Sequence, residues 1–98
     1  KVEQLIQKMT LKEKIGQMTQ ITINYMLEGP GVYNPLLPYR LDPDSLKKTI
    51  IDKNVGSILG GAKGPFTLEE WRTFIKEIQD AASKTRLNIP VIYGVDAI

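Results

Sequence analysis

Asp96 is the residue of this sequence whose position most favours a chemical role. It follows Ile89 to Val95, an apolar run typical of a buried strand. Carboxyl ends of parallel strands are where α/β sheets and barrels gather catalytic and binding groups, and packing gives no reason for a carboxylate there. The competing interpretation is a helix cap or an ion pair inside a barrel mouth. The residues alone leave these two interpretations evenly balanced.

A glycine-rich stretch, GGAKG at 60–64, follows an earlier apolar segment. Glycines after a strand can hold a phosphate at the start of a helix. The spacing here lacks the Lys-Ser or Lys-Thr pair of a phosphate loop, and Pro65 intervenes before any helix. An ordinary turn between a strand and a helix is therefore the favoured interpretation.

Aromatic residues offer a second kind of candidate site. Tyr25, Tyr33 and Tyr39 lie in a segment rich in proline and glycine, where they could form a stacking platform for a sugar or another flat ligand. Packing of this loop against its own domain is at least as well supported. Trp71 stands at helical spacing with other apolar residues, so we expect it to pack in the core.

The composition excludes several classes of site. The 98 residues contain no histidine and no cysteine, which rules out a Ser-His-Asp triad, thiolate metal ligands and disulfides within this sequence. No metal or organic cofactor is indicated. The net charge of +2 comes from interspersed charges of both signs, which argues against a nucleic-acid partner or an anionic membrane. No apolar run approaches the roughly 20 residues that span a bilayer.

Hydrophobic periodicity predicts alternating helices and strands. Capping boxes are predicted at Thr10 with Glu13 and at Thr67 with Glu70, and Phe66 with Trp71 has the spacing of a hydrophobic staple. The predicted elements are a helix over 2–9, a helix after Thr10 that includes Leu11, Ile15 and Met18, a strand over about 18–24, a helix from Asp42 to Asn54, a strand over 55–59, a helix from Thr67 to about Lys84 whose inward stripe is Trp71, Phe74, Ile75, Ile78 and Ala82, and a strand over 89–95.

This order of elements predicts an α/β fold with parallel strands and helical crossovers. Three parallel strands leave an open edge at the last one, and an apolar edge such as VIYGV associates unless something covers it. The sheet is therefore expected to be unfinished.

Four segments carry a resemblance to a known family. They are MTLKEKIGQMTQ, VGSILGG, the helix with FTLEEW, and TRLNIPVIYGVDAI. Together they resemble the opening of glycoside hydrolase family 3, in the branch of β-glucosidases and exo-β-glucanases. The resemblance extends from Val2 to Ile98.

The resemblance implies that residues 1–98 are an incomplete N-terminal segment of a TIM-barrel-like (β/α)8 domain. The rest of the barrel and a second α/β domain would lie outside this sequence, and in the family a His-Gly pair follows the position of Ile98. Asp96 matches the aspartate that hydrogen-bonds the sugar before the cleaved bond, which favours substrate binding over a cap. The family's aspartate nucleophile and glutamate acid/base belong to later regions, so no catalytic residue is expected here. Other acids, expected on helix starts or solvated faces and not as partners of Asp96, are Asp42, Asp44, Asp52, Glu69, Glu70, Glu77 and Asp80.

The expected function is retaining hydrolysis of terminal β-linked glucose from gluco-oligosaccharides, with Asp96 in the sugar-binding site. The isolated chain is expected to be inactive, because its partners are a β-glucoside substrate and the rest of the enzyme. Export to the periplasm or the medium is what the resemblance implies. Two alternatives remain open: a family 3 enzyme for β-xylosides or, less favoured, N-acetylglucosaminides, and a non-catalytic sugar-binding module.

Overall fold

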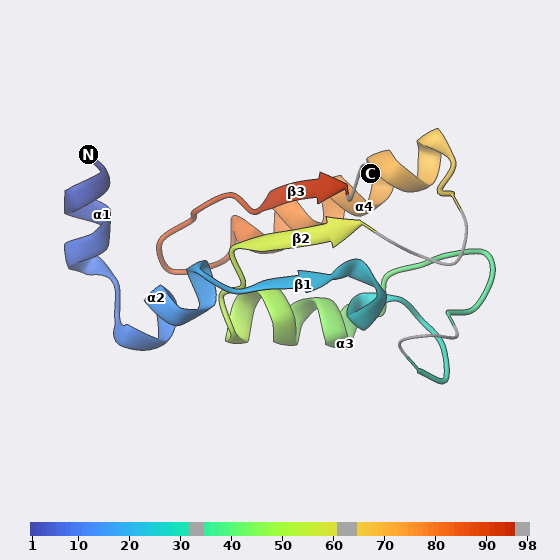
Figure 1. Cartoon of the computed structure of the whole chain (residues 1–98), viewed down its shortest axis with the longest axis horizontal. Coiled ribbons are helices and arrows are strands. Elements are labelled where there is room, and N and C mark those ends of the chain that lie inside the picture. The colour runs from blue at the N-terminus through green and yellow to red at the C-terminus, as the bar shows by residue number, and fades with distance from the viewer. Residues whose placement is uncertain (32–34, 61–64, 96–98) are drawn as a thin grey trace.

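The chain forms a mixed α/β structure around a small parallel sheet, as the alternation of elements predicts (Figure 1). The computed structural model describes residues 1–31, 35–60 and 65–95. Its three strands are β1 (Gln20–Thr22), β2 (Ser57–Gly60) and β3 (Ile92–Val95), in the order β1-β2-β3 with both pairings parallel. Helices α1 and α2 lie beyond the amino ends of the strands, and the segment after β1 turns at the carboxyl ends (Figure 1).

Helices α1 (Val2–Lys8) and α2 (Leu11–Gln17) begin the chain, close to their predicted positions. The hydroxyl of Thr10 accepts the backbone N–H of Glu13 at 3.2 Å. The Glu13 carboxylate instead accepts two hydrogen bonds from Arg86, at 3.0 and 2.8 Å. The first predicted capping box is therefore only half formed, because a distant guanidinium engages the carboxylate.

Strand β1 is shorter than predicted, because the chain leaves the strand after Thr22 and enters the 3-10 helix η1 (Ile23–Met26). The Thr22 hydroxyl accepts the N–H of Asn24 at 3.4 Å. A side-chain cap of this kind competes with continued strand pairing. The turn places Ile23 and Met26, both fully buried, in the hydrophobic core.

The next helical segment consists of α3 (Pro43–Leu46) and the π-helix η2 (Lys47–Asp52). Asp42 caps its start, with Oδ2 accepting from the backbone N–H of Ser45 at 3.1 Å. Asn54 follows with φ 55°, the left-handed conformation expected where this helix closes. The change from α to π geometry was not predicted.

Helix α4 (Leu68–Ala82) has the strongest local signals, and both hydrogen bonds of its capping box form. The predicted staple forms, with the ring centroids of Phe66 and Trp71 5.6 Å apart. Phe74, Ile78 and Ala82 are buried as expected, but Ile75 is 38% exposed. The inclusion of Ile75 in the inward stripe was wrong, since Ala81 takes the remaining buried position.

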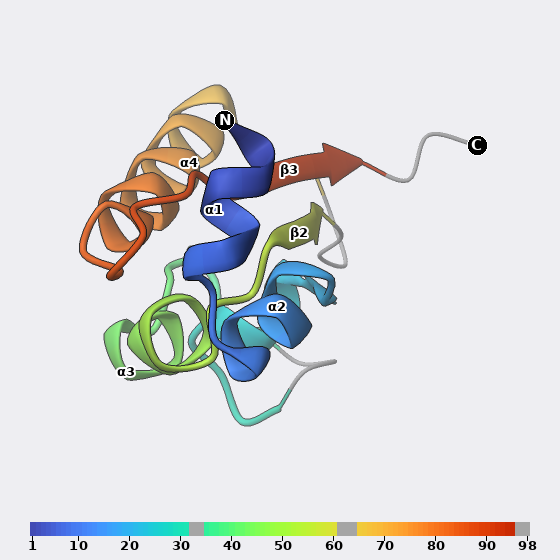
Figure 2. The ribbon, with the colours of Figure 1, turned by 90° about the vertical axis from the view of Figure 1, so that its left-hand side faces the viewer.

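Among the described elements, helices cover only one face of the sheet. Ile21, Ile58 and Tyr93 stand opposite one another in register and pack against the helical side. Side chains alternate along strands, so Ile92 faces the other way, and it is 68% exposed. Figure 2 shows α3 and α4 together on one side of the strands. Strand β3 therefore has a covered and an open face, whereas its apolar run is typical of a buried strand.

Close backbone contact joins α2 to the amino ends of the strands. The N–H of Gly56 donates to the carbonyl of Gly16 at 2.9 Å. A Cβ on Gly16 would lie 2.1 Å from the carbonyl oxygen of Lys53, and one on Gly56 would lie 2.1 Å from that of Gln17. These glycines let α2 approach more closely than any side chain allows.

No helix within the described residues is both long enough and apolar enough to cross a bilayer.

Candidate functional site

The carboxyl edge of the sheet is the place where the fold brings chemical groups together. Because the strands are parallel, β1, β2 and β3 all end on this side. Gly60 at the end of β2 is paired with Val95 at the end of β3. Segments more than thirty residues apart in sequence therefore meet at one edge.

Asp96, the predicted substrate-binding residue, lies outside the described residues. Its predecessor Val95 is the last residue of β3, so the chain reaches position 96 from the carboxyl edge. Positions 61–64 of the glycine-rich stretch also lie outside the described residues.

Gly60 has a clear packing role. A Cβ at this position would lie 2.7 Å from the hydroxyl oxygen of Tyr93 on the neighbouring strand. The absent side chain thus makes room for the end of the Tyr93 ring. This contact explains a glycine at position 60 without any ligand.

Tyr93 belongs to an aromatic cluster between β3 and α4. Its ring packs edge-on against that of Trp71, with the ring centroids 4.9 Å apart. The Trp71 ring packs in the same way against that of Phe66. The Tyr93 hydroxyl oxygen is buried and has no hydrogen-bond partner among the described residues. Burial raises the pKa of the Tyr93 phenol above its ordinary value. Trp71 packs against these rings but is only partly buried and lies outside the buried core cluster, so its predicted place in the core is confirmed only in part.

The two described tyrosines of the loop, Tyr25 and Tyr39, have different surroundings. Tyr39 packs its ring edge-on against Phe66 at 5.2 Å, which makes it part of the core. Tyr25, in η1, is 57% exposed. Tyr33 lies outside the described residues. Among the described tyrosines of this loop, only Tyr25 offers ring surface for a ligand.

Several acidic side chains have the structural roles that the sequence predicts. Asp42 and Glu70 bond to backbone groups at helix starts. Asp52 pairs with Lys47 at 3.4 Å and Asp80 with Lys76 at 2.7 Å, both on exposed surface. These four carboxylates therefore need no catalytic explanation.

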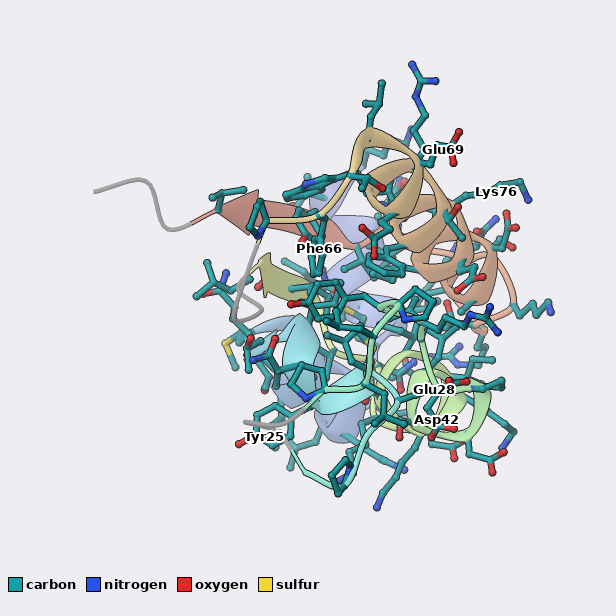
Figure 3. All side chains as sticks on the ribbon, turned by 90° about the vertical axis from the view of Figure 1, so that its right-hand side faces the viewer. Tyr25, Glu28, Asp42, Phe66, Glu69 and Lys76 are labelled. Atoms are coloured by element: carbon teal, nitrogen blue, oxygen red, sulfur yellow. The ribbon has the colours of Figure 1, made fainter. Side chains whose placement is uncertain are left out.

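A hollow of about 430 Å³, which no sequence pattern predicted, opens beside η1. Asn24, Tyr25, Glu28, Asp42 and Ser45 line it, together with Leu27 and two loop glycines. Figure 3 shows Glu28 next to Asp42 and Tyr25 at some distance from both, whereas Glu69 and Lys76 lie on α4. One signal could have indicated this site: Asn24, like Asp96, is a polar residue just after a strand.

The backbone around the hollow is held by hydrogen bonds between η1 and the segment before α3. Asp42 N–H donates to the carbonyl of Met26 at 2.6 Å, and Glu28 N–H donates to that of Arg40 at 2.8 Å. Leu27 and Leu41 form an isolated antiparallel bridge between them, and both are buried. These contacts hold Glu28 and Asp42 on the same wall.

The chemistry of this wall is that of hydrogen-bond acceptors. The carboxylate oxygens of Glu28 and Asp42 are hydrogen-bond acceptors, and the Oδ1 of Asn24 is buried without a partner among the described residues. The Ser45 hydroxyl is already committed as a donor to Asp42 at 2.7 Å. The acceptors that this wall can offer to a ligand are therefore the carboxylates of Glu28 and Asp42, because the Oδ1 of Asn24 has no accessible surface. Neither the protein-family models nor the curated proteins compared with the sequence match it.

Proposed function

We propose that this chain belongs to a retaining β-glucosidase of the glycoside hydrolase family 3 type and supplies part of its sugar-binding site. The support is the resemblance of four sequence segments, about eighty residues from the first to the last, together with the parallel α/β fold. In this proposal residues 1–98 are the N-terminal part of a TIM-barrel-like domain. The enzyme acts in the periplasm or outside the cell.

The observation that carries the proposal is the direction of β3. It runs parallel to β2 and ends at the carboxyl edge, one residue before Asp96. A carboxylate that leaves a strand at this edge lies where barrel enzymes bind their substrates. An antiparallel last strand would have ended at the opposite side of the sheet.

The open parts of the sheet support a larger barrel. Ile92, on the open face of β3, is 68% exposed, and β1 and β3 are edge strands among the described residues. Further strands would cover this apolar surface and pair the free backbone groups. The bare face of β3 would then become part of the barrel interior.

The proposed mechanism is double displacement with retention. It requires two carboxyl groups about 5 Å apart, one that attacks the anomeric carbon and one that transfers a proton. Both would come from parts of the enzyme outside these residues. Asp96 would bind sugar hydroxyls, so that binding energy favours the distorted ring of the transition state.

The test is hydrolysis of aryl β-glycosides by the intact protein that carries this sequence. We expect cleavage of an aryl β-glucoside with retention, and Asp96→Ala should lower kcat/KM at least about a hundredfold because a charged hydrogen bond in the transition state is lost. Asp80→Asn, on exposed α4 surface, is the matched control and should leave kcat/KM unchanged. Near-normal hydrolysis by Asp96→Ala would contradict the assignment of Asp96.

A small panel of substrates separates the alternatives. Faster cleavage of an aryl β-xyloside or N-acetylglucosaminide would move the substrate class but keep the reaction. Glucose binding by the intact protein without hydrolysis of any glycoside would favour the non-catalytic module.

A further inference from the structure

We propose that a groove along α2 is the docking site for one further segment of the same protein. This segment carries both apolar and acidic side chains and leads into a strand that pairs with β1. The inference rests on the proposed function, because the larger barrel supplies that strand. The α2 groove has a volume of about 470 Å³; Leu11, Ile15 and Val55 contribute apolar side chains to its wall, and Lys12 and Lys53 contribute ammonium groups.

The apolar side chains of the α2 groove are the first argument. Leu11 is 74% exposed and Ile15 is 54% exposed. Among the residues of α2 only Gly16 is buried, so the helix meets the rest of the fold chiefly through its backbone. The greater part of both apolar side chains is therefore without cover among the described residues. Apolar surface that gathers in one groove is typical of an interface.

The charges of the α2 groove are the second argument. Neither Lys12 nor Lys53 belongs to an ion pair within the part of the chain that the structure describes. No described acidic side chain lines the groove. An apolar wall with ammonium groups is complementary to an apolar segment that carries carboxylates, whereas a second copy of the groove would set ammonium groups against ammonium groups. Charge complementarity therefore favours an acidic occupant over self-association.

The position of the groove beside the free edge of β1 is the third argument. Thr19, Lys53 and Val55 line both the α2 groove and a second hollow of about 610 Å³. All residues of β1 (Gln20–Thr22) line this second hollow, together with residues of α3 and η2. The α2 groove is thus continuous with the space beside β1.

The space beside β1 suits another strand. The carbonyl of Thr19 accepts the N–H of Ser57 on β2, and successive residues of a strand point their backbone groups to opposite sides. The backbone groups of Gln20 and Thr22 therefore point away from β2, toward the free edge. A strand parallel to β1, as barrel closure requires, begins at the amino end, where α2 lies (Figure 1). The residues that lead into this strand pass the α2 groove and are its occupant.

The experiment is cross-linking of the intact protein with a water-soluble carbodiimide, followed by mass spectrometry of its peptides. The reagent joins an amine to a carboxylate in contact with it as an amide, and takes up the water that is lost. We expect Lys12 or Lys53 to link to an Asp or Glu outside residues 1–98, in a peptide that directly precedes an apolar run typical of a strand. Lys76, which pairs with Asp80 at 2.7 Å, should link to that residue and is the control for the reagent.

Two leucines test the apolar part of the groove. Leu11 and Leu68 each begin a helix and are 74% and 65% exposed, but only Leu11 lines the α2 groove. Leu11→Ser should lower the Tm of the intact protein by at least about 2 °C, because contact with the occupant is lost. Leu68→Ser is the matched control and should leave the Tm unchanged. Equal shifts for the two variants would overturn the inference, and cross-linking of the wild type remains informative if Leu11→Ser fails to fold.

Other cross-linking results would also overturn the inference. These are no link from either lysine, links within residues 1–98 alone, or links to a segment that precedes no strand. A mixture of 15N-labelled and unlabelled protein identifies links between copies, which would assign the groove to a second copy. Binding to vesicles of phosphatidylserine and phosphatidylcholine that Lys53→Glu abolishes would assign it to a membrane surface.

A failure of the proposed function gives a different pattern, because cross-linking and Tm need no substrate. If the intact protein cleaves no glycoside but Lys12 or Lys53 forms the expected link, the docking site stands and the hydrolase fails. If the protein cleaves glycosides and neither lysine forms the link, only the docking site fails.

Discussion

The hydroxyl oxygen of Tyr93 is a polar atom buried inside an aromatic cluster. Its hydroxyl oxygen is buried, lacks a partner among the described residues, and occupies the space left by Gly60. A buried hydroxyl without a hydrogen bond contributes little to stability or opposes it. The ring itself packs against Trp71, so the residue's contribution to the fold lies in its carbon atoms.

We expect Tyr93→Phe to leave the free energy of unfolding at pH 7 unchanged or slightly higher. The sign at high pH follows from the raised pKa of the phenol. The unfolded state releases this proton near pH 10, before the folded state does, so the Tyr93 contribution to stability falls as pH rises through this range. Denaturant unfolding at pH 7 and above pH 10 should show a smaller alkaline loss for Tyr93→Phe than for wild type.

An equal alkaline loss in both proteins would contradict this expectation. The comparison with Tyr93→Phe separates the effect from that of lysines and other tyrosines, which titrate in the same range in both proteins.

At the scale of elements, two glycines control how α2 meets the sheet. Gly16 faces the carbonyl groups of Lys53 and Asn54, which are backbone atoms with little freedom to move. A methyl group there forces α2 away from the amino ends of the strands. Position 16 requires glycine because α2 lies so close to the backbone of Lys53 and Asn54, and helix propensity matters less here.

We expect Gly16→Ala to lower the free energy of unfolding by about 3 kcal/mol, because the added Cβ overlaps backbone atoms. Gly31→Ala is the control, since a Cβ there meets no atom within 4 Å. Chemical denaturation of the intact protein measures both. A cost for Gly16→Ala no larger than that for Gly31→Ala would mean that α2 can shift without loss.

Arg86 ties the segment before β3 to the junction of α1 and α2. Its guanidinium donates to both carboxylate oxygens of Glu13 and to the carbonyl of Lys8. The Glu13 side chain is only 14% exposed, so this ion pair is more shielded than those on the outer surface. Bidentate geometry gives such a pair more strength than a single surface contact.

We expect Arg86→Met to lower the free energy of unfolding by about 1 kcal/mol, since the guanidinium itself is 55% exposed and partly screened. Lys76→Met, which removes an exposed pair on α4, should cause no measurable change. The same denaturation series at low and high salt tests both variants. A similar cost for the two would show that the bidentate contact adds nothing.

At the scale of the whole molecule, apolar surface without cover is the main feature. Leu11 and Met18 beside the amino ends of the strands are 74% and 81% exposed, and Ile92 on the open sheet face is 68% exposed. Exposed apolar patches and free strand edges favour association. In the proposed barrel this surface would be buried within the same enzyme.

We therefore expect the isolated 98-residue chain to associate in solution and to hydrolyse no aryl glucoside. Light scattering over a range of concentrations measures the association, and Ile92→Lys should reduce it by placing a charge on the open face. An isolated chain that stays monomeric at all concentrations would weaken the case for a barrel completed by further strands. Hydrolysis by the isolated chain would contradict the proposed source of its nucleophile.

The sequence by itself determined the features that depend on neighbours within a few residues. It predicted the caps at Thr10 and Thr67, the helical segment between Asp42 and Asn54, and the order of helices and strands. Hydrogen bonds between residues three or four positions apart, and the periodicity of apolar residues, are written in the local pattern. The α/β class followed from that order.

Only the tertiary structure decided which of these local options prevailed. It engaged Glu13 with Arg86 instead of with its own helix start, and it placed Glu28 beside Asp42 around the hollow. It also separated the packed Tyr39 from the exposed Tyr25. These outcomes depend on contacts between segments far apart in sequence, and no local pattern specifies such contacts, because their energies arise only when the chain has folded.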